Sequence, residues 1–385
     1  MIYVDNAATS WPKPDCVYEA MLAYMRDVGA NPGRSGHRLA NEAERLRFDA
    51  REALAELFGV SDPMRVIFML NATEALNLVI RGLLTPGAHV VATSMEHNSV
   101  MRPIRAAEHR GASVSLVPCR SDGTMAPDVI EEYIRPETRL IVANHASNVC
   151  GTVLPIRAIG AVARRTGVPF LVDAAQTAGC LPINIPTDNI DLLAFTGHKS
   201  MLGPTGTGGL VIDDAFDIAL LPPMTYGGTG SRSEQETQPD FLPDKYESGT
   251  PNMTGLAGLD AGVRYVLKHG VERIREHEQS VTRQLLSGLK SIAGVRVLGT
   301  GDPDGQTAVV SFTIDGQSCS ETAHILDERF GILCRPGLHC APRAHRTLGT
   351  SPEGTVRLSL GLFNTEAEVG RVLDAVADLA GGKTR

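Results

Sequence analysis

The sequence has no long hydrophobic run, and none of its apolar stretches approaches the ~20 residues that a membrane-spanning helix needs. Its start, M-I-Y-V-D-N, lacks the basic end and the apolar stretch of a signal peptide. Positive charge is also in deficit, because 36 Lys and Arg stand against 44 Asp and Glu, for a net charge of −8. Nucleic-acid binding needs clustered cations. We therefore expect a cytoplasmic protein that binds neither membranes nor nucleic acid.

The sequence also lacks the patterns of a disulfide-rich or a nucleotide-binding protein. Its seven cysteines are odd in number and scattered along 385 residues, which does not fit a disulfide framework. No G-x-x-x-x-G-K-S/T motif is present, and no G-x-G-x-x-G opens an early helix. The length is more than twice the ~150 residues of a typical domain, so we expect two domains.

Short β-rich runs alternate with helical patterns through the first two thirds of the chain. The runs lie near residues 65, 89, 113, 139, 169 and 191, and the helical spacing falls in 74–83, 99–110, 127–134 and 156–166. Such alternation predicts an α/β fold with a mostly parallel sheet sandwiched by helices. Ligands of these sheets collect at the carboxyl ends of the strands.

The pattern changes after about residue 214. A Gly-, Pro- and Ser-rich stretch over 222–254 predicts a loop, and one long helical pattern follows over 256–292. The remainder is typical of a smaller α+β unit with antiparallel strands. We therefore predict a large domain over 14–250 and a small domain made of 1–13 and 251–385.

Two charged side chains follow predicted strands. Asp173 ends the run L-V-D and Lys199 follows the run D-L-L-A-F in T-G-H-K, 26 residues later, with Gln176 one turn beyond Asp173. Taken singly, the lysine could be a solvated surface charge and the aspartate a helix cap. Together they match the needs of pyridoxal phosphate, which requires a Schiff-base lysine and a partner for its ring nitrogen.

A phosphate site is predicted where a helix begins after the V-I-F-M strand. Free backbone N–H groups at Ala72, Thr73 and Glu74, with the Thr73 hydroxyl, could bind an anion there. An ordinary helix cap explains the same residues. His97 follows the next strand and Asn148 a later one. A lone histidine is more often structural, so His97 depends on its neighbours.

Several motifs in order resemble the class V aminotransferase family, and more narrowly cysteine desulfurases and selenocysteine lyases. They are E-H-N-S-V, S-N-V-C-G-T, V-D-A-A-Q, T-G-H-K, G-P-T-G and E-S-G-T-P-N, and the resemblance runs from Tyr3 to Thr365. It implies a homodimeric enzyme of fold type I that uses pyridoxal 5′-phosphate, with Lys199 as its Schiff-base lysine.

The resemblance also implies the roles of the other site residues. Around the cofactor ring, Asp173 would pair with the pyridinium nitrogen, Gln176 would bond near the ring hydroxyl, and His97 would stack on the ring. The cofactor phosphate would be bound by Thr73, Thr196 and His198, together with Thr250 from the partner subunit. On the substrate side, Asn148 would touch cofactor and substrate, Arg357 would hold the carboxylate, and Arg335 and His37 would lie near it. Without the resemblance, Arg357 would be taken for a surface strand residue.

Cys340 stands in C-R-P-G-L-H-C-A-P-R, where the resembling family has R-x-G-x-H-C-A and a cysteine that attacks the substrate sulfur. A thiol on a Gly-containing loop beside Arg335 and His339 suits this role. Two alternatives are a buried inert cysteine and a metal site with Cys334, His339, Cys340 and His345. The four lack a recognised zinc spacing, so we expect no metal.

The sequence thus predicts an enzyme that removes sulfur from L-cysteine, leaving L-alanine and a persulfide on Cys340, with His97 moving protons. Residues 341–356 separate Cys340 from Arg357, a short segment that resembles members which hand sulfur to a dedicated acceptor protein. The nearest alternative is a selenocysteine lyase acting on L-selenocysteine. Another C–S lyase, an aminotransferase or an epimerase would leave Cys340 unused, and a regulatory protein would more naturally lack the lysine or carry a DNA-binding unit.

Overall fold

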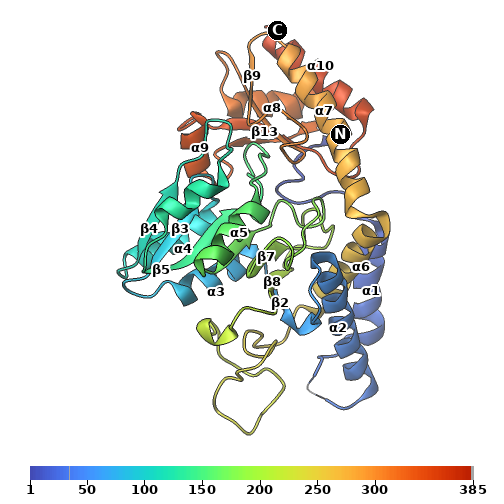
Figure 1. The fold of residues 1–385 in the computed structure, drawn as a ribbon. Helices are drawn as coiled ribbons and strands as arrows, with labels where there is room; N and C mark the ends of the chain where they lie inside the picture. The colour runs from blue at the N-terminus through green and yellow to red at the C-terminus, as the bar shows by residue number, and fades with distance from the viewer. Residues whose placement is uncertain (34, 383–385) are drawn as a thin grey trace.

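The computed structural model describes residues 1–33 and 35–382, and a seven-stranded sheet forms its centre (Figure 1). In spatial order the strands are β2 (Val66–Met69), β8 (Gly208–Ile212), β7 (Leu192–Thr196), β6 (Phe170–Asp173), β5 (Thr138–Asn144), β3 (His89–Thr93) and β4 (Ser113–Val117). β8 runs antiparallel to both of its neighbours, and every other neighbouring pair is parallel. The predicted mostly parallel α/β sheet is confirmed.

Helices cover both faces of this sheet because its strands are apolar on both sides. One face packs against α3 (Ala72–Leu83) and α4 (Asn98–Glu108). The other packs against α2 (Arg38–Phe58), α5 (Ile156–Thr166) and α6 (Met253–His269). Neighbouring residues of one strand point to opposite faces, as the strand period of two requires.

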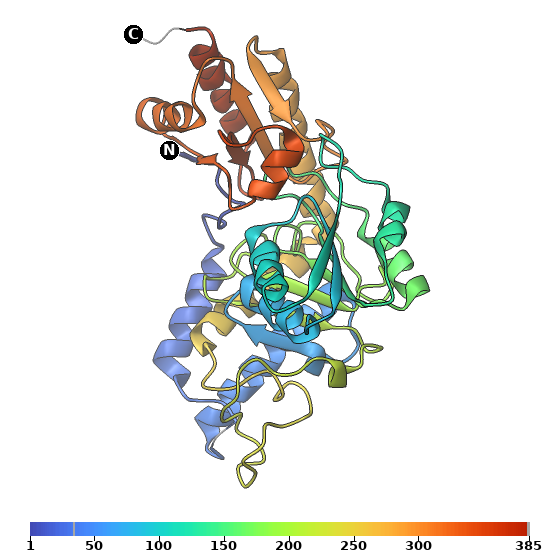
Figure 2. The ribbon, with the colours of Figure 1, turned by 90° about the vertical axis from the view of Figure 1, so that its left-hand side faces the viewer.

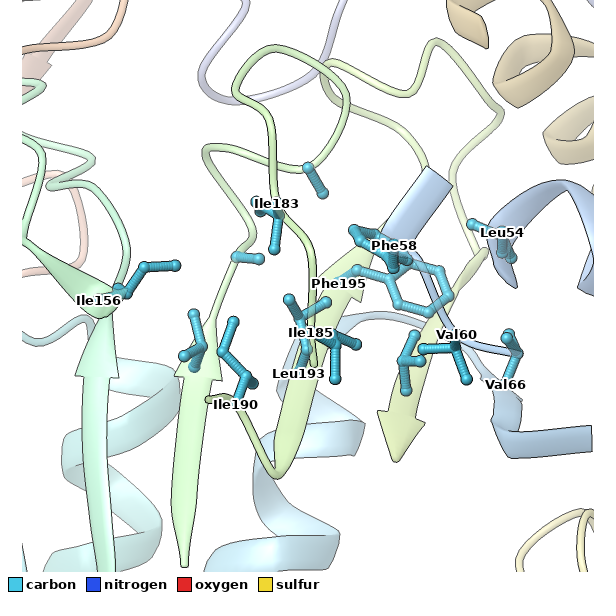
Figure 3. Close-up of a cluster of buried hydrophobic side chains, with 14 of the residues drawn as sticks. Leu54, Phe58, Val60, Val66, Ile156, Ile183, Ile185, Ile190, Leu193 and Phe195 are labelled. Carbon is cyan, nitrogen blue, oxygen red and sulfur yellow. The ribbon is translucent and has the colours of Figure 1, made fainter. Parts of the chain in front are cut away.

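Strand β7 shows this division between the two cores. Leu193 and Phe195 pack in the core with Phe58, and the rings of Phe58 and Phe195 lie 5.8 Å apart (Figure 3). Leu192 and Ala194, the alternate residues, belong to the core on the α3 and α4 side. A strand buried on both faces holds its carboxyl end firmly, and Lys199 follows directly from this one.

The second unit contains a four-stranded antiparallel sheet. Its order is β12 (Arg335–Gly337), β13 (Thr355–Ser359), β10 (Val309–Ile314) and β9 (Val295–Leu298). Helices α7 (Val271–Ser291), α8 (Cys319–Phe330) and α10 (Glu366–Ala380) lie with it at one end of the molecule (Figures 1 and 2). The chain start joins this unit through β1 (Ile2–Tyr3), which pairs with β11 (Ile332–Leu333).

The single helical pattern predicted over 256–292 is wrong, since it is two helices. Gly270 separates α6 from α7 at φ +83°, a conformation that an L side chain rarely adopts. The domain boundary near residue 250 stays a prediction, and α6, which follows it, packs against α1 (Asp15–Ala23) and α2.

The remaining elements are short. They are α9 (Pro342–Leu348), a π-helical turn over Tyr24–Val28, and 3₁₀ turns over Pro63–Arg65, Pro127–Tyr133 and Ile218–Leu220. In the described part of the chain, no helix combines the length and the apolar character needed to cross a membrane.

Candidate active site

A cavity of about 100 Å³ lies where the parallel strands of the large sheet end. β6 ends at Asp173 and β7 at Thr196, and the turn after β7 carries Lys199. Nine residues that the sequence predicts for the cofactor line it: Ala72, Thr73, His97, Asn148, Asp173, Gln176, Thr196, His198 and Lys199. The site therefore forms at the sheet edge where ligands of such folds bind.

Lys199 lies in this cavity in an environment that favours its neutral amine. Burial lowers the pKa of Lys199 to about 8, with nearby Arg357 and Arg335 lowering it further and Asp173 opposing the shift. A lysine with this pKa is partly unprotonated near neutral pH, and the unprotonated amine is the nucleophile and the base. The alternative of a solvated surface lysine does not fit this position.

Asp173 is a buried carboxyl group that also lines the cavity. Its Oδ1 accepts a hydrogen bond from the Ala175 N–H at 3.0 Å. A turn follows Asp173 and no helix begins there, so Asp173 is not a helix cap. Burial raises the pKa of Asp173, and the Ala175 N–H and Lys199 oppose that shift. A cationic ring nitrogen placed against this carboxyl group would favour its ionised form.

Several buried polar atoms around the cavity have no hydrogen-bond partner among the described residues. They include Thr196 Oγ1, His198 Nδ1 and Asn148 Oδ1. A buried polar atom left unpaired costs about 1–3 kcal/mol, so a polar occupant of the cavity would stabilise it. With a reactive amine and a buried carboxyl group added, this set of donors and acceptors fits pyridoxal phosphate.

The predicted phosphate end is built from the starts of two helices. Thr73 in the first turn of α3 and Ser99 in the first turn of α4 bring their hydroxyl oxygens to 2.7 Å of each other. Asn71 caps α3, and its Oδ1 accepts a hydrogen bond from the Glu74 N–H at 3.0 Å. The free amide that the sequence predicts at Glu74 is therefore engaged, whereas Ser99 is an additional hydroxyl that the sequence reading missed.

His97 lines the cavity and also caps α4. Its Nδ1 accepts a hydrogen bond from the Ser99 N–H at 3.0 Å, which leaves Nε2 to carry the proton of the neutral ring. Burial, followed by the positive charges of Lys199, Arg335 and Arg102, lowers the pKa of His97 to about 4. The His97 imidazole is therefore neutral at pH 7, which suits its predicted stacking on the cofactor ring.

The start of the chain holds the lysine turn in place. The Ser10 hydroxyl donates to the Lys199 carbonyl at 2.8 Å, and Lys13 Nζ donates to the His198 carbonyl at 2.8 Å. Gln176 Nε2 donates to the Ala7 carbonyl at 3.1 Å. Residues 7–13 thus support the backbone turn of His198 and Lys199 and the side chain of Gln176, a contribution that the sequence reading did not include.

Arg357 is 1% exposed, so the expectation of a surface residue, formed without the resemblance, is wrong. Its Nη2 donates to Asp5 Oδ1 at 2.6 Å and its Nη1 donates to the Asn148 carbonyl at 3.0 Å. Its Nε is buried and has no partner among the described residues. The guanidinium group is fixed on two sides, and the N–H donors that these two bonds do not use, Nε–H among them, could meet an anion such as a carboxylate.

Cys340 lies on a loop that hydrogen bonds hold in place, and its side chain is exposed. Both His339 and Cys340 adopt left-handed backbone conformations, with φ of +49° and +58°. The Cys340 carbonyl accepts from the Asn98 N–H at 2.9 Å, and the His339 carbonyl accepts from Asn148 Nδ2 at 2.6 Å. Arg335 Nη2 lies 3.5 Å from Cys340 Sγ. The alternative of a buried inert cysteine is wrong.

His339 and His345 bond to each other instead of facing a common metal position. His339 Nδ1 lies 3.4 Å from His345 Nε2, and His345 Nδ1 lies 2.8 Å from Thr350 Oγ1. In the described residues, no group of three or more His, Cys, Asp or Glu side chains is arranged to hold a metal ion.

Six predicted site residues are not among those that line the cavity, namely Cys340, Arg335, Arg357, Glu74, His37 and Thr250. His37 is exposed and caps α2, its Nδ1 accepting from the Ala40 N–H at 3.2 Å. Thr250 is exposed and lines a separate hollow of about 180 Å³ together with Glu74. The predicted contact of Thr250 is with the cofactor phosphate in the site of the partner subunit, and this contact stays a prediction.

Comparisons with known proteins identify the family of this chain. The model of the aminotransferase class-V family matches residues 2–372. A probable cysteine desulfurase of Methanothermobacter thermautotrophicus is 36% identical over 99% of this chain and 95% of its own length. A probable cysteine desulfurase of Aeropyrum pernix is 35% identical over 98% of this chain and 94% of its own.

Solved structures give the same result for the fold. The apo structure of a cysteine desulfurase from Thermococcus onnurineus NA1 superposes with a TM-score of 0.91 at 33% identity, covering 99% of this chain and 95% of that one. The cysteine desulfurase CsdA from Escherichia coli gives a TM-score of 0.86 at 28% identity, with 99% and 94% coverage. The fold is fold type I, and the chain belongs to the class V aminotransferase family, whose cofactor is pyridoxal phosphate.

Proposed function

We propose that this chain is a cysteine desulfurase, which takes the sulfur of L-cysteine, releases L-alanine and carries the sulfur as a persulfide on Cys340. The observation that carries the proposal is the position of Cys340. An exposed thiol stands on a fixed loop beside Arg335, and it lines the same groove as Thr73, His97 and Ser99 of the cofactor cavity. Other chemistry of the family gives this thiol no task.

The residues of the cavity divide the binding of cofactor and substrate among them. Lys199 and Asp173 would hold the two ends of the cofactor ring, and Thr73, Thr196 and His198 would bind its phosphate. Asn148 and Arg357 would orient the substrate, because the free Nε of Arg357 suits its carboxylate. When bound, pyridoxal phosphate withdraws the electron pair left on the substrate Cα.

The side chains then carry the protons and the sulfur. Lys199 Nζ, kept partly neutral by burial, takes the proton from Cα. The Cys340 thiolate attacks the substrate sulfur, so a sulfur–sulfur bond forms while the Cβ–sulfur bond breaks. The electron pair of that bond stays on carbon, which a proton completes to L-alanine. His97, whose neutral ring lines the cavity and carries its proton on Nε2, would serve that transfer. Substrate sulfur is oxidised and carbon is reduced, so no outside oxidant is needed.

The active unit in this proposal is a homodimer in the cytoplasm that passes its sulfur to an acceptor protein. Thr250 supports the dimer because it is exposed on a loop and lines no part of its own cofactor cavity. All seven cysteines are free, which fits a reducing compartment.

The test is to incubate the purified holoenzyme with L-cysteine and, separately, with L-selenocysteine under reductant. Alanine is measured beside sulfide or selenide, and mass spectrometry locates any persulfide. Alanine and sulfide in equal amounts with a persulfide on Cys340 support the proposal. Alanine from selenocysteine alone would make the chain a selenocysteine lyase, and no alanine from either substrate would contradict both assignments.

A further inference from the structure

The surface around Cys340 is strongly basic, although the chain as a whole carries a net charge of −8. A groove of about 550 Å³ leads from Cys340 over α3 and α4. Arg81, Arg102 and Arg110 line it, Pro103 and Ala106 give it an apolar floor, and no acidic residue is among its lining residues. Such a groove is larger than one amino acid needs.

Helix α9, which follows Cys340 directly, continues this basic surface. It lies beside the start of α4 (Figures 1 and 2), where Thr347 Oγ1 donates to the Ser94 carbonyl at 3.2 Å. Its Arg343 and Arg346 add two charges. Burial lowers the pKa of Arg343, and the positive charges of Arg105 and Arg346 lower it further.

We call Arg81, Arg102, Arg110, Arg343 and Arg346 the arginine rim. In the part of the chain that the structure describes, none of the five makes an ion pair with a carboxylate. The neighbouring Arg105 differs, since it pairs with Glu108 on the same helix. A cluster of unpaired like charges attracts anions and accelerates their association.

The ligands of the reaction itself do not account for the rim. None of its five arginines lines the cofactor cavity, so the cofactor phosphate has other donors. The carboxylate of L-cysteine is assigned to Arg357, which lies on β13 and not in the groove. A further anion of larger size therefore has to be considered.

We propose that the arginine rim is the docking surface for the sulfur acceptor, and that this acceptor is a protein whose thiol lies within an acidic segment. The proposal rests on the desulfurase function above. The exposed Cys340 is among the residues that line the groove, so a segment bound in it can bring its thiol to the persulfide. Acidic side chains flanking that thiol would then meet Arg102 and Arg110 in the groove and Arg346 on α9.

The transfer step is balanced without a further reagent. The acceptor thiolate attacks the outer sulfur of the Cys340 persulfide, and the sulfur–sulfur bond to Cys340 breaks. Cys340 leaves as a thiolate, and the acceptor becomes the persulfide. The arginines favour this step by concentrating the anionic partner, without contributing a bond to the reaction.

The experiment uses two synthetic peptides as probes, one with a single cysteine flanked by glutamates and one with lysines in their place. Persulfide on Cys340 is formed with L-cysteine and quantified first, so that each assay starts from a known load. Sulfur transfer to each peptide is then followed by mass spectrometry at low and at high salt. We expect the acidic peptide to react about tenfold faster or more at low salt, and the advantage to shrink as salt rises.

Charge reversal distinguishes the rim from general electrostatics. Arg102→Glu with Arg346→Glu should remove the advantage of the acidic peptide. The matched control is Arg157→Glu with Arg273→Glu, which changes the net charge equally at two exposed arginines on α5 and α7. The control should keep the advantage.

Several results would overturn the proposal. Equal rates for the two peptides, or equal losses in the rim and control variants, would remove the rim as the docking surface. Dissociation of the rim variant in sedimentation would show that a second copy of this chain covers the groove. Loss of cofactor absorbance in that variant would assign the arginines to the cofactor. Failure to form any persulfide on Cys340 is a separate result, because it contradicts the proposed function itself.

Discussion

The loop that carries Cys340 is held by a chain of three hydrogen bonds, and a substitution of His345 is the most direct way to break that chain. His339 Nε2 faces the Arg335 carbonyl at 3.0 Å, and a carbonyl can only accept, so this nitrogen carries the proton. His339 Nδ1 is then the acceptor for His345 Nε2, and His345 Nδ1 accepts from the Thr350 hydroxyl. Burial lowers the pKa of His339 to about 3 and that of His345 to about 4, so both rings are neutral at pH 7.

The magnitude of the effect follows from what the loop has to overcome. Left-handed backbone costs roughly 1–2 kcal/mol for each of His339 and Cys340, or about 2–4 kcal/mol together. Replacing His345 by phenylalanine keeps a ring but leaves His339 Nδ1 buried without a donor, at a cost of about 1–3 kcal/mol. We expect kcat for sulfide release to fall about tenfold or more, since each 1.4 kcal/mol lost from the competent loop is a factor of ten.

The assay separates positioning from a general loss of stability. KM for L-cysteine should change little, because Arg357 and Asn148 are untouched. His345→Gln, which can both donate and accept, should retain much of the activity and serves as the matched control. If His345→Phe keeps kcat within about twofold while its melting temperature falls, the hydrogen-bond chain stabilises the fold and does not position the thiol.

Four further outcomes are expected. Lys199→Ala should lose both turnover and the borohydride-reducible link to the cofactor, and survival of that link would contradict its role. Cys340→Ser should keep the cofactor but accumulate no persulfide and release almost no sulfide, whereas a parental rate on L-cysteine would exclude Cys340 as the acceptor. When Thr250→Glu and Lys199→Ala protomers are mixed, part of the activity should return, because each heterodimer has one site with an intact Lys199 and an intact Thr250 from its partner. A fully active monomer in sedimentation would refute the shared site. Burial lowers the pKa of His145 to about 3, so below about pH 6.5 the unfolded chain binds a proton that the folded chain excludes. The free energy of unfolding should therefore decrease as the pH is lowered from about 6.5 toward 3, by up to about 1.4 kcal/mol per pH unit. His145→Gln should flatten that slope in thermal unfolding.

The parts of the site that follow strand ends could be predicted from the sequence. Asp173 and Lys199 each follow an apolar run directly, and parallel strands bring their carboxyl ends to one edge of the sheet. Local spacing is enough for such residues. The helix starts at Thr73 and His97 are of the same kind, since their capping residues lie beside them in the chain.

Contacts between distant segments could not be predicted in this way. Asp5 meets Arg357 across 352 positions, and Ser10 meets Lys199 across 189. Neither pair has a local signature, because the contact exists only after the chain start has joined β11 and the small sheet. The interruption at Gly270 had a local signal, a glycine inside a helical pattern, but its φ of +83° is fixed by the packing of α6 and α7 on separate neighbours.

Asn148 joins the two parts of the proposed reaction. Its carbonyl accepts from Arg357 Nη1 at 3.0 Å, and its Nδ2 donates to the His339 carbonyl at 2.6 Å. Its Oδ1 faces the cofactor cavity without a partner among the described residues. One buried residue, through its backbone carbonyl and its side-chain amide, therefore joins Arg357, the arginine proposed to bind the carboxylate, to the loop of Cys340. Because an attack on sulfur depends on sub-ångström placement of the two sulfur atoms, this residue links the binding of the substrate to the reach of the thiol.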